Sequence, residues 1–225
     1  MSHDTSSDPR IVVAEVAAAG LAKHLPQLPR QHQRELQPVV GPLRQHVATL
    51  RYSFLPPRQA AEQGLLDPIE SAGASLLRNW GELSRLQKPS ERMAASWVRF
   101  AGVTLAGLRR RLLEGEPRFA HSIEAAWGSV AHVEPIAERL WRLKIDAGRL
   151  GKFTVVTNLP GVSSGDVRAF AVLPPRRIGG EISQGMLIEA EGEGEPGAPA
   201  LPVGRSEGEV EAALREAARE LGVRV

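Results

Sequence analysis

The stretch Leu140-Trp141-Arg142-Leu143-Lys144-Ile145-Asp146 alternates apolar and charged side chains without a break. Successive side chains of a β-strand point to opposite faces, so this pattern predicts a strand with one buried and one exposed face. The expected core face consists of Trp141, Leu143 and Ile145, and the outer face carries Arg142 and Lys144. The sequence Asp146-Ala147-Gly148 is typical of the turn that would end such a strand.

Four further segments around this strand have β character, namely residues 128–133, 152–157, 166–173 and 186–189. In the second of them Phe153 and Val155 share one face. Five short strands at this spacing predict a small barrel or sandwich.

Residues 10–114 have helical periodicity that is interrupted by prolines. Proline lacks the N–H that a helix interior needs, so we expect the prolines between positions 26 and 89, Pro38 and Pro42 among them, to separate consecutive helices. Ser90 is the expected N-cap of the helix that ends near Gly115. This region is predicted to be a small helical bundle.

The two ends of the chain have different patterns. Residues 1–9 are polar and are expected to be disordered, and residues 191–205 form a Glu/Gly/Pro linker with little apolar content. Ser206 and Glu209 have capping-box spacing at the start of a helix over residues 206–225. The predicted fold class is α+β, with a helical domain at 10–126, a five-stranded domain at 127–190 and a C-terminal helix.

Composition excludes several classes of site. Among 225 residues there is no cysteine, which excludes disulfides, thiolate metal sites and cysteine nucleophiles. Residues 1–126 and 127–188 carry net charges of +4 and +3, whereas residues 189–225 carry −5, so a polyanion would be drawn to the first two segments. Neither a signal pattern nor a bilayer-spanning apolar stretch is recognisable, and the chain is expected to be soluble and cytoplasmic.

Three segments resemble motifs of one known family, in the family's order: VEPIAERL at 133–140, VVTNL at 155–159 and LPPRRIGGEISQGML at 173–187. The family is the tRNA-binding domain family of OB-folds. It includes stand-alone structure-specific tRNA-binding proteins and domains of methionyl-, tyrosyl- and phenylalanyl-tRNA synthetases. The resemblance covers residues 127–190, and the chain departs from the family at Gly179, where a bulky or basic residue is usual, and in the short loop after Asn158.

The resemblance implies a five-stranded OB-fold barrel that binds RNA, with tRNA as the expected ligand. OB barrels bind RNA on the outer face of their second and third strands, which places Arg142 and Lys144 near phosphates. Arg176 and Arg177, expected in a loop between the fourth and fifth strands, can grip phosphate or stack on a base. The resemblance adds Ser183 and Met186 to the site, Gln184 lies between them, and Asn158 can read a base edge.

Each of these residues also has an ordinary structural interpretation. Arg142, Lys144 and the two loop arginines would then be solvated surface charges, Ser183 and Gln184 would satisfy a turn, and Met186 would begin a core strand. The run Arg109-Arg110-Arg111 could extend a phosphate track, but cations are favoured at the end of any helix. Trp80 and Trp97 are expected in the helical core, while Trp127 is undecided.

No catalytic, cofactor or metal site is predicted. The histidines His3, His24, His32, His46, His121 and His132 show neither metal-ligand spacing nor a carboxylate cluster, and no phosphate-loop or nucleophile motif is present. We therefore expect a non-catalytic protein that binds tRNA. Its expected protein partners are a second copy of the same chain, in a homodimer, or an aminoacyl-tRNA synthetase. The alternatives are a scaffold whose helical domain docks a partner, a general single-strand-binding OB protein, and an enzyme of unrecognised type in the N-terminal region.

Overall fold

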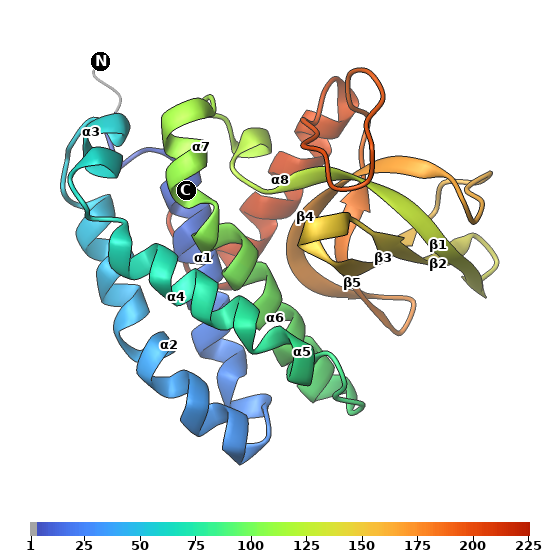
Figure 1. Ribbon diagram of the computed structural model, residues 1–225, viewed down its shortest axis with the longest axis horizontal. Coiled ribbons are helices and arrows are strands. Elements are labelled where there is room, and N and C mark those ends of the chain that lie inside the picture. The colour runs from blue at the N-terminus through green and yellow to red at the C-terminus, as the bar shows by residue number, and fades with distance from the viewer. Residues whose placement is uncertain (1–3) are drawn as a thin grey trace. The chain divides into compact units, whose positions relative to one another are not determined.

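A computed structural model describes residues 4–225 of the chain. Within this range the chain forms two compact units, one built from the part up to Ser122 together with Leu214–Val225 and one from Ile123–Ala213 (Figure 1). Helices precede a five-stranded antiparallel sheet in these described residues, and a further helix follows it. The predicted α+β class is confirmed.

The helical unit is organised around α1, which packs against α2, α6 and α7. Helix α1 is apolar nearly all round, with Ile11, Val13 and Leu21 fully buried, as expected of a helix at the centre of a bundle. None of the helices in residues 4–225 combines the length and the hydropathy that crossing a membrane requires. The elements are α1 (Pro9–His24), η1 (Leu25–Gln27), α2 (Arg30–Arg51), α3 (Pro57–Glu62), α4 (Asp67–Arg78), α5 (Trp80–Leu83), α6 (Pro89–Ala106), α7 (Leu108–Glu114) and η2 (Phe119–His121).

Prolines begin several of these helices. Pro57, Pro68 and Pro89 lie in the first turn of α3, α4 and α6, where the missing N–H has no intrahelical partner to lose. Lys88 is the N-cap of α6 and Ser90 lies inside the helix, because Pro89 already occupies the first helical position.

Pro38 and Pro42 do not separate helices, which corrects the prediction. Both lie inside the continuous helix α2, on its exposed face, while Leu36, Val40 and Leu43 are buried on the other face. The carbonyl groups that lose a hydrogen bond to these prolines therefore face water, and burial of the apolar face holds the helix together.

The N-terminal segment also differs from its prediction. Residues 1–3 of the predicted disordered segment 1–9 lie outside the described residues, but Thr5 and Asp8 are fully buried. The N–H of Thr5 donates to the carbonyl oxygen of Leu55 at 3.0 Å, and Asp8 caps α1 by accepting from the N–H of Arg10 at 2.8 Å. The polar side chains of this segment are therefore used as caps and hydrogen-bond partners.

The barrel unit contains β1 (Ala125–Ala137), β2 (Leu140–Asp146), β3 (Lys152–Thr157), β4 (Val167–Ile178) and β5 (Glu181–Leu187). The strand order is β3-β2-β1-β4-β5, and β3 and β5 at the two edges lie against each other, so the sheet closes with the connectivity of an OB-fold. Side chains join the closing strands. The N–H of Val156 donates to Ser183 Oγ at 3.0 Å, and the N–H of Thr154 donates to Gln184 Oε1 at 2.9 Å.

The barrel core follows the alternation of the sequence. Leu143 and Ile145 of β2 are fully buried as predicted, whereas Trp141 is half-buried at the strand's end. Phe153 of β3 packs against Phe170 of β4, with ring centroids 5.1 Å apart.

The fifth strand runs over Glu181–Leu187 instead of the predicted residues 186–189. Gly179 and Gly180 adopt φ angles of +58° and +84° and connect β4 to β5 by a tight hairpin in which Ile178 pairs with Glu181. Arg176 and Arg177 therefore lie on β4 and not in a loop. The apolar pattern predicted a start at residue 186, five residues after the observed start, because Ser183 and Gln184 are polar. These two residues belong to the strand and bond to the neighbouring strand β3.

The segment predicted as a free linker packs on the barrel. The N–H of Trp127 in β1 donates to the carbonyl oxygen of Ala198 at 2.9 Å, and the N–H of Ala200 donates to that of Ala125 at 3.0 Å. Backbone hydrogen bonds thus replace the apolar side chains that the segment lacks. Helix α8 (Arg205–Glu220) follows, and the hydroxyl of Ser206 accepts a hydrogen bond from the N–H of Glu189 at 2.8 Å, which is not the capping box predicted.

Candidate nucleic-acid interface

The barrel unit contains an open cleft of about 760 Å³. Its walls are formed by the end of β3 and the loop that follows, by β4 and β5, and by the first turns of α8. The volume lies in the range of small-molecule binding sites. The lining residues with polar or charged side chains are Thr157, Asn158, Arg168, Arg176, Glu189, Arg205, Ser206 and Glu209.

Three of the predicted site residues line this cleft. Asn158 follows β3, Arg176 lies on β4 and Met186 lies on β5, so two of the motif segments contribute to one depression. Asn158 and Arg176 are exposed, and Met186 is half-buried. The barrel closure explains their convergence, because β3 and β5 are far apart in sequence but adjacent in space.

Sequence reasoning missed two further arginines of the cleft, Arg168 and Arg205. Arg168 pairs with Asp166 at 3.0 Å, and the pKa of Asp166 is held below its ordinary value, first by a backbone hydrogen bond from Ser163 and then by Arg168. The alternation along β4 could have indicated Arg168, whereas no local pattern indicates Arg205.

Arg205 forms an exposed ion pair with Glu209, at 2.7 Å, on the first turns of α8. Exposed pairs of this type are worth less than about 1 kcal/mol, so a phosphate oxygen can replace the carboxylate at Arg205. The cleft therefore has three guanidinium groups, opposed by the carboxylates of Glu189 and Glu209.

Arg142 and Lys144 do not belong to the cleft lining. Arg142 forms ion pairs with Glu134 on β1 and, at 3.1 Å, with Glu181 on β5. These carboxylates raise the pKa of Arg142, with the hydrogen bond to Glu134 as the largest cause. Lys144 Nζ donates to Thr154 Oγ1 at 2.8 Å. Both side chains tie neighbouring strands together.

Ser183, Gln184 and Arg177 also lie outside the lining. Ser183 is 1% exposed, and its hydroxyl accepts from Val156 and donates to the carbonyl oxygen of Gly185 at 2.8 Å. Gln184 is buried and holds β3 through its amide oxygen. Arg177 is exposed on β4 directly beside Arg176.

Packing also explains the glycine of this motif. A Cβ at Gly185 would lie 2.1 Å from the carbonyl oxygen of Ala171, so β4 and β5 can approach only because residue 185 is glycine.

The arginine run on α7 does not form a phosphate track. Arg109 pairs with Glu70 at 2.7 Å and with Asp67 at 2.5 Å, and its pKa is raised mainly by the hydrogen bond to Glu70. Arg111 is buried and donates to the carbonyl oxygen of Thr104. Trp97 lies in the helical core as predicted, and Trp127 contacts the segment after β5, since a Cβ at Gly194 would collide with its ring.

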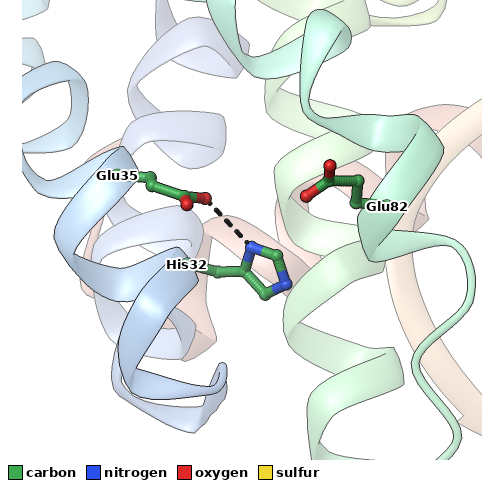
Figure 2. A group of neighbouring side chains, drawn as sticks. All are labelled: His32, Glu35 and Glu82. Carbon is green, nitrogen blue, oxygen red and sulfur yellow. Dashed lines mark hydrogen bonds and ion pairs between the residues drawn. The ribbon is translucent and has the colours of Figure 1, made fainter.

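His32 has carboxylate neighbours that the sequence pattern did not reveal. His32 lies 3.1 Å from Glu35, and Glu82 of α5 points toward the pair (Figure 2). The spacing of His32 and Glu35 on one helix was the available signal. His3 lies outside the described residues.

The chain has little detectable similarity to known proteins. The chain matches no protein-family model and no curated protein sequence. It is similar to a solved structure of the chaperone CsaA from Bacillus anthracis str. Ames, with 24% sequence identity over 37% of this chain and 82% of that chain, and with a TM-score of 0.27. A similarity at this TM-score does not identify a function for this chain.

Proposed function

We propose that the barrel unit binds folded tRNA, without catalysing a reaction on it, and that the cleft between β3, β4, β5 and α8 holds an unpaired nucleotide of the RNA. The observation that carries the proposal is the convergence of Asn158, Arg176 and Met186 on one cleft. The motifs that contain these three residues are the ones that resemble the tRNA-binding domain family.

The chemistry of the lining fits a nucleotide. Guanidinium groups bind phosphate oxygens through paired N–H donors, and Arg168, Arg176 and Arg205 offer such groups around the cleft. Asn158 has both a donor and an acceptor for the edge of a base. Met186 and Leu159 supply apolar surface for the face of a base or ribose.

The acidic residues of the cleft support a preference for RNA of a particular folded shape. Glu189 and Glu209 line the same cleft and repel phosphates, so a bound RNA backbone is expected to follow the arginines. An RNA whose fold already presents an unpaired nucleotide loses less conformational entropy on binding than a flexible strand does. Folded tRNA is therefore expected to bind better than unstructured RNA.

The test uses two neighbouring arginines on β4. Binding of folded tRNA and of unstructured RNA of equal length is measured across a salt series for the intact chain, Arg176→Ala and Arg177→Ala. We expect Arg176→Ala to weaken tRNA binding on the order of tenfold and to reduce the salt slope by about one phosphate contact. Arg177→Ala is the matched control, because Arg177 is exposed on the same strand but does not line the cleft.

Equal losses for the two variants would place the RNA elsewhere on the barrel surface. Absence of tRNA binding by the intact chain at low salt would refute the proposed function itself.

A second candidate function concerns the helical unit alone. The turn after α2 exposes Tyr52 and Phe54, with 59% and 64% of their surface accessible and their ring centroids 6.4 Å apart. Phe54 has a φ angle of 55°, a conformation that costs a non-glycine residue about 1 kcal/mol or more. A strained turn that presents two aromatic rings fits a site that docks a protein partner.

In this second candidate the helical unit binds an aminoacyl-tRNA synthetase, and the barrel delivers tRNA to it. Purified synthetases are titrated against the intact chain and Tyr52→Ser/Phe54→Ser, with Leu113→Ser, another exposed apolar residue, as the control. The candidate requires a synthetase that binds the intact chain and Leu113→Ser but not the double variant. Size-exclusion chromatography separates this outcome from homodimerisation through the same turn.

A further inference from the structure

Three side chains with metal-binding atoms meet on the helical unit. His32 and Glu35 belong to α2, and Glu82 belongs to α5 (Figure 2). One ligand atom from each residue lies within 4.8 Å of the others, and His32 Nδ1 is 3.1 Å from Glu35 Oε2. A single cation placed among these atoms would be within reach of all three.

The cluster follows from local and tertiary structure together. His32 and Glu35 are three positions apart on α2, so their side chains lie on the same face of the helix. Gln31 Nε2 donates to Glu35 Oε1 at 3.0 Å. This hydrogen bond orients the Glu35 carboxylate beside the imidazole.

Glu82 distinguishes this cluster from an ordinary helical His–Glu pair. The carboxylate of Glu82 points from α5 toward the gap beside His32 and Glu35 (Figure 2). Among the described residues it has no hydrogen-bond or ion-pair partner. Two carboxylates thus lie near one imidazole, an arrangement that a divalent cation would stabilise.

We propose that His32, Glu35 and Glu82 bind one first-row divalent transition-metal ion of the Zn²⁺ type. The donor set decides the class, because an imidazole nitrogen favours Zn²⁺ and its neighbours in the series, whereas an all-oxygen set would favour Mg²⁺ or Ca²⁺. Three protein ligands leave a position for water. This site was not predicted from the sequence, where the histidines lacked metal-ligand spacing.

A bound ion would link α2 to the short helix α5 within the helical unit. Because the ion binds the folded arrangement of the three ligands, its binding stabilises that unit in proportion to the ion concentration. The proposal does not depend on RNA binding, and either can fail without the other.

The experiment is calorimetric titration of ZnCl₂ into the metal-free intact chain and four variants. His32→Ala and Glu82→Gln each remove one ligand. His46→Gln, on the same helix, and Glu62→Gln, in α3, change the same residue types outside the cluster. We expect one Zn²⁺ per intact chain, a loss of affinity of at least about tenfold in each ligand variant, and no change in the two controls.

Two further readouts accompany the titration. Zn²⁺ should raise the unfolding temperature of the intact chain and of both controls, but not of His32→Ala or Glu82→Gln. MgCl₂ should bind more weakly than ZnCl₂, and Zn²⁺ affinity should fall in acid, because imidazole binds a metal only in its neutral form. Glu82 is exposed, so Glu82→Gln tests the site even if His32→Ala unfolds.

The proposal is overturned if the intact chain binds no Zn²⁺. It is also overturned if His32→Ala and Glu82→Gln bind Zn²⁺ as tightly as His46→Gln does, since the ion would then lie at another site.

Discussion

Three arginines of the helical unit and two arginines at the barrel cleft have opposite surroundings. Arg10, Arg99 and Arg111 of the helical unit are 3%, 2% and 4% exposed, whereas the side chains of Arg168 and Arg205 at the barrel cleft are 49% and 83% exposed. Both parts of the sequence are basic. The comparison teaches that net charge does not locate a polyanion site, because only accessible guanidinium groups can bind phosphate.

The largest expected change in the free energy of unfolding comes from breaking a buried ion pair of the helical unit. Arg10 pairs with Asp8 and donates to the carbonyl oxygen of Arg111 at 2.8 Å. Asp8→Ala leaves a buried guanidinium without its carboxylate and removes the cap of α1, so it should lower the free energy of unfolding by about 3–5 kcal/mol. Urea denaturation measures the change.

The control for that variant is Glu62→Ala, which breaks the exposed Arg58–Glu62 pair. It should change the free energy of unfolding by less than about 1 kcal/mol. Similar losses of unfolding free energy for Asp8→Ala and Glu62→Ala would mean that burial does not determine how much these ion pairs stabilise the protein.

The next effect separates stability from RNA binding inside the barrel motif. Ser183→Ala leaves the N–H of buried Val156 without the acceptor that it has at 3.0 Å, which should lower the free energy of unfolding by about 1–3 kcal/mol. The folded variant should keep its affinity for tRNA. Urea denaturation and RNA titration are compared with Ser164→Ala, an exposed serine. A weaker RNA affinity at unchanged stability would return Ser183 to the binding site.

A smaller effect concerns pH. Burial lowers the pKa of Arg99 to about 9, well below its value in the unfolded chain. Above this pH the folded state releases a proton that the unfolded state still holds, so the free energy of unfolding should rise between about pH 9 and pH 12. Denaturation at about pH 8 and pH 10 should show this rise for the intact chain and not for Arg99→Met. An equal rise in both proteins would assign it to other groups.

The smallest effect compares turns of the two units. Phe54 of the helical unit and Gly161 of the barrel both have positive φ angles, 55° and 79°. Phe54→Gly should raise the free energy of unfolding by up to about 1 kcal/mol, and Gly161→Ala should lower it by a similar amount. Thermal unfolding checks both. A destabilised Phe54→Gly would show that the phenyl ring contributes more packing than its exposure suggests.

The two units differ in how much of their secondary structure the sequence predicts. Strands β2 and β3 have the predicted bounds, because alternation of side chains is a local property that a strand must express. The bounds of α2 were not predictable, since Pro38 and Pro42 are tolerated only where tertiary packing buries the opposite face. The candidate site was predicted in part. The motifs pointed to Asn158, Arg176 and Met186, but no sequence pattern indicated Arg205.

The sequence by itself determined the α+β class, the order of helices and strands, and the residue types from which a nucleotide site could be made. Only the tertiary structure decided which of those residues are accessible. The sequence assigned both Arg142 and Arg176 to the RNA site, yet Arg142 pairs with Glu134 and Glu181 while Arg176 lines the cleft. The physical reason is that barrel closure brings together side chains from strands that are distant in the chain, such as Glu181 of β5 and Arg142 of β2.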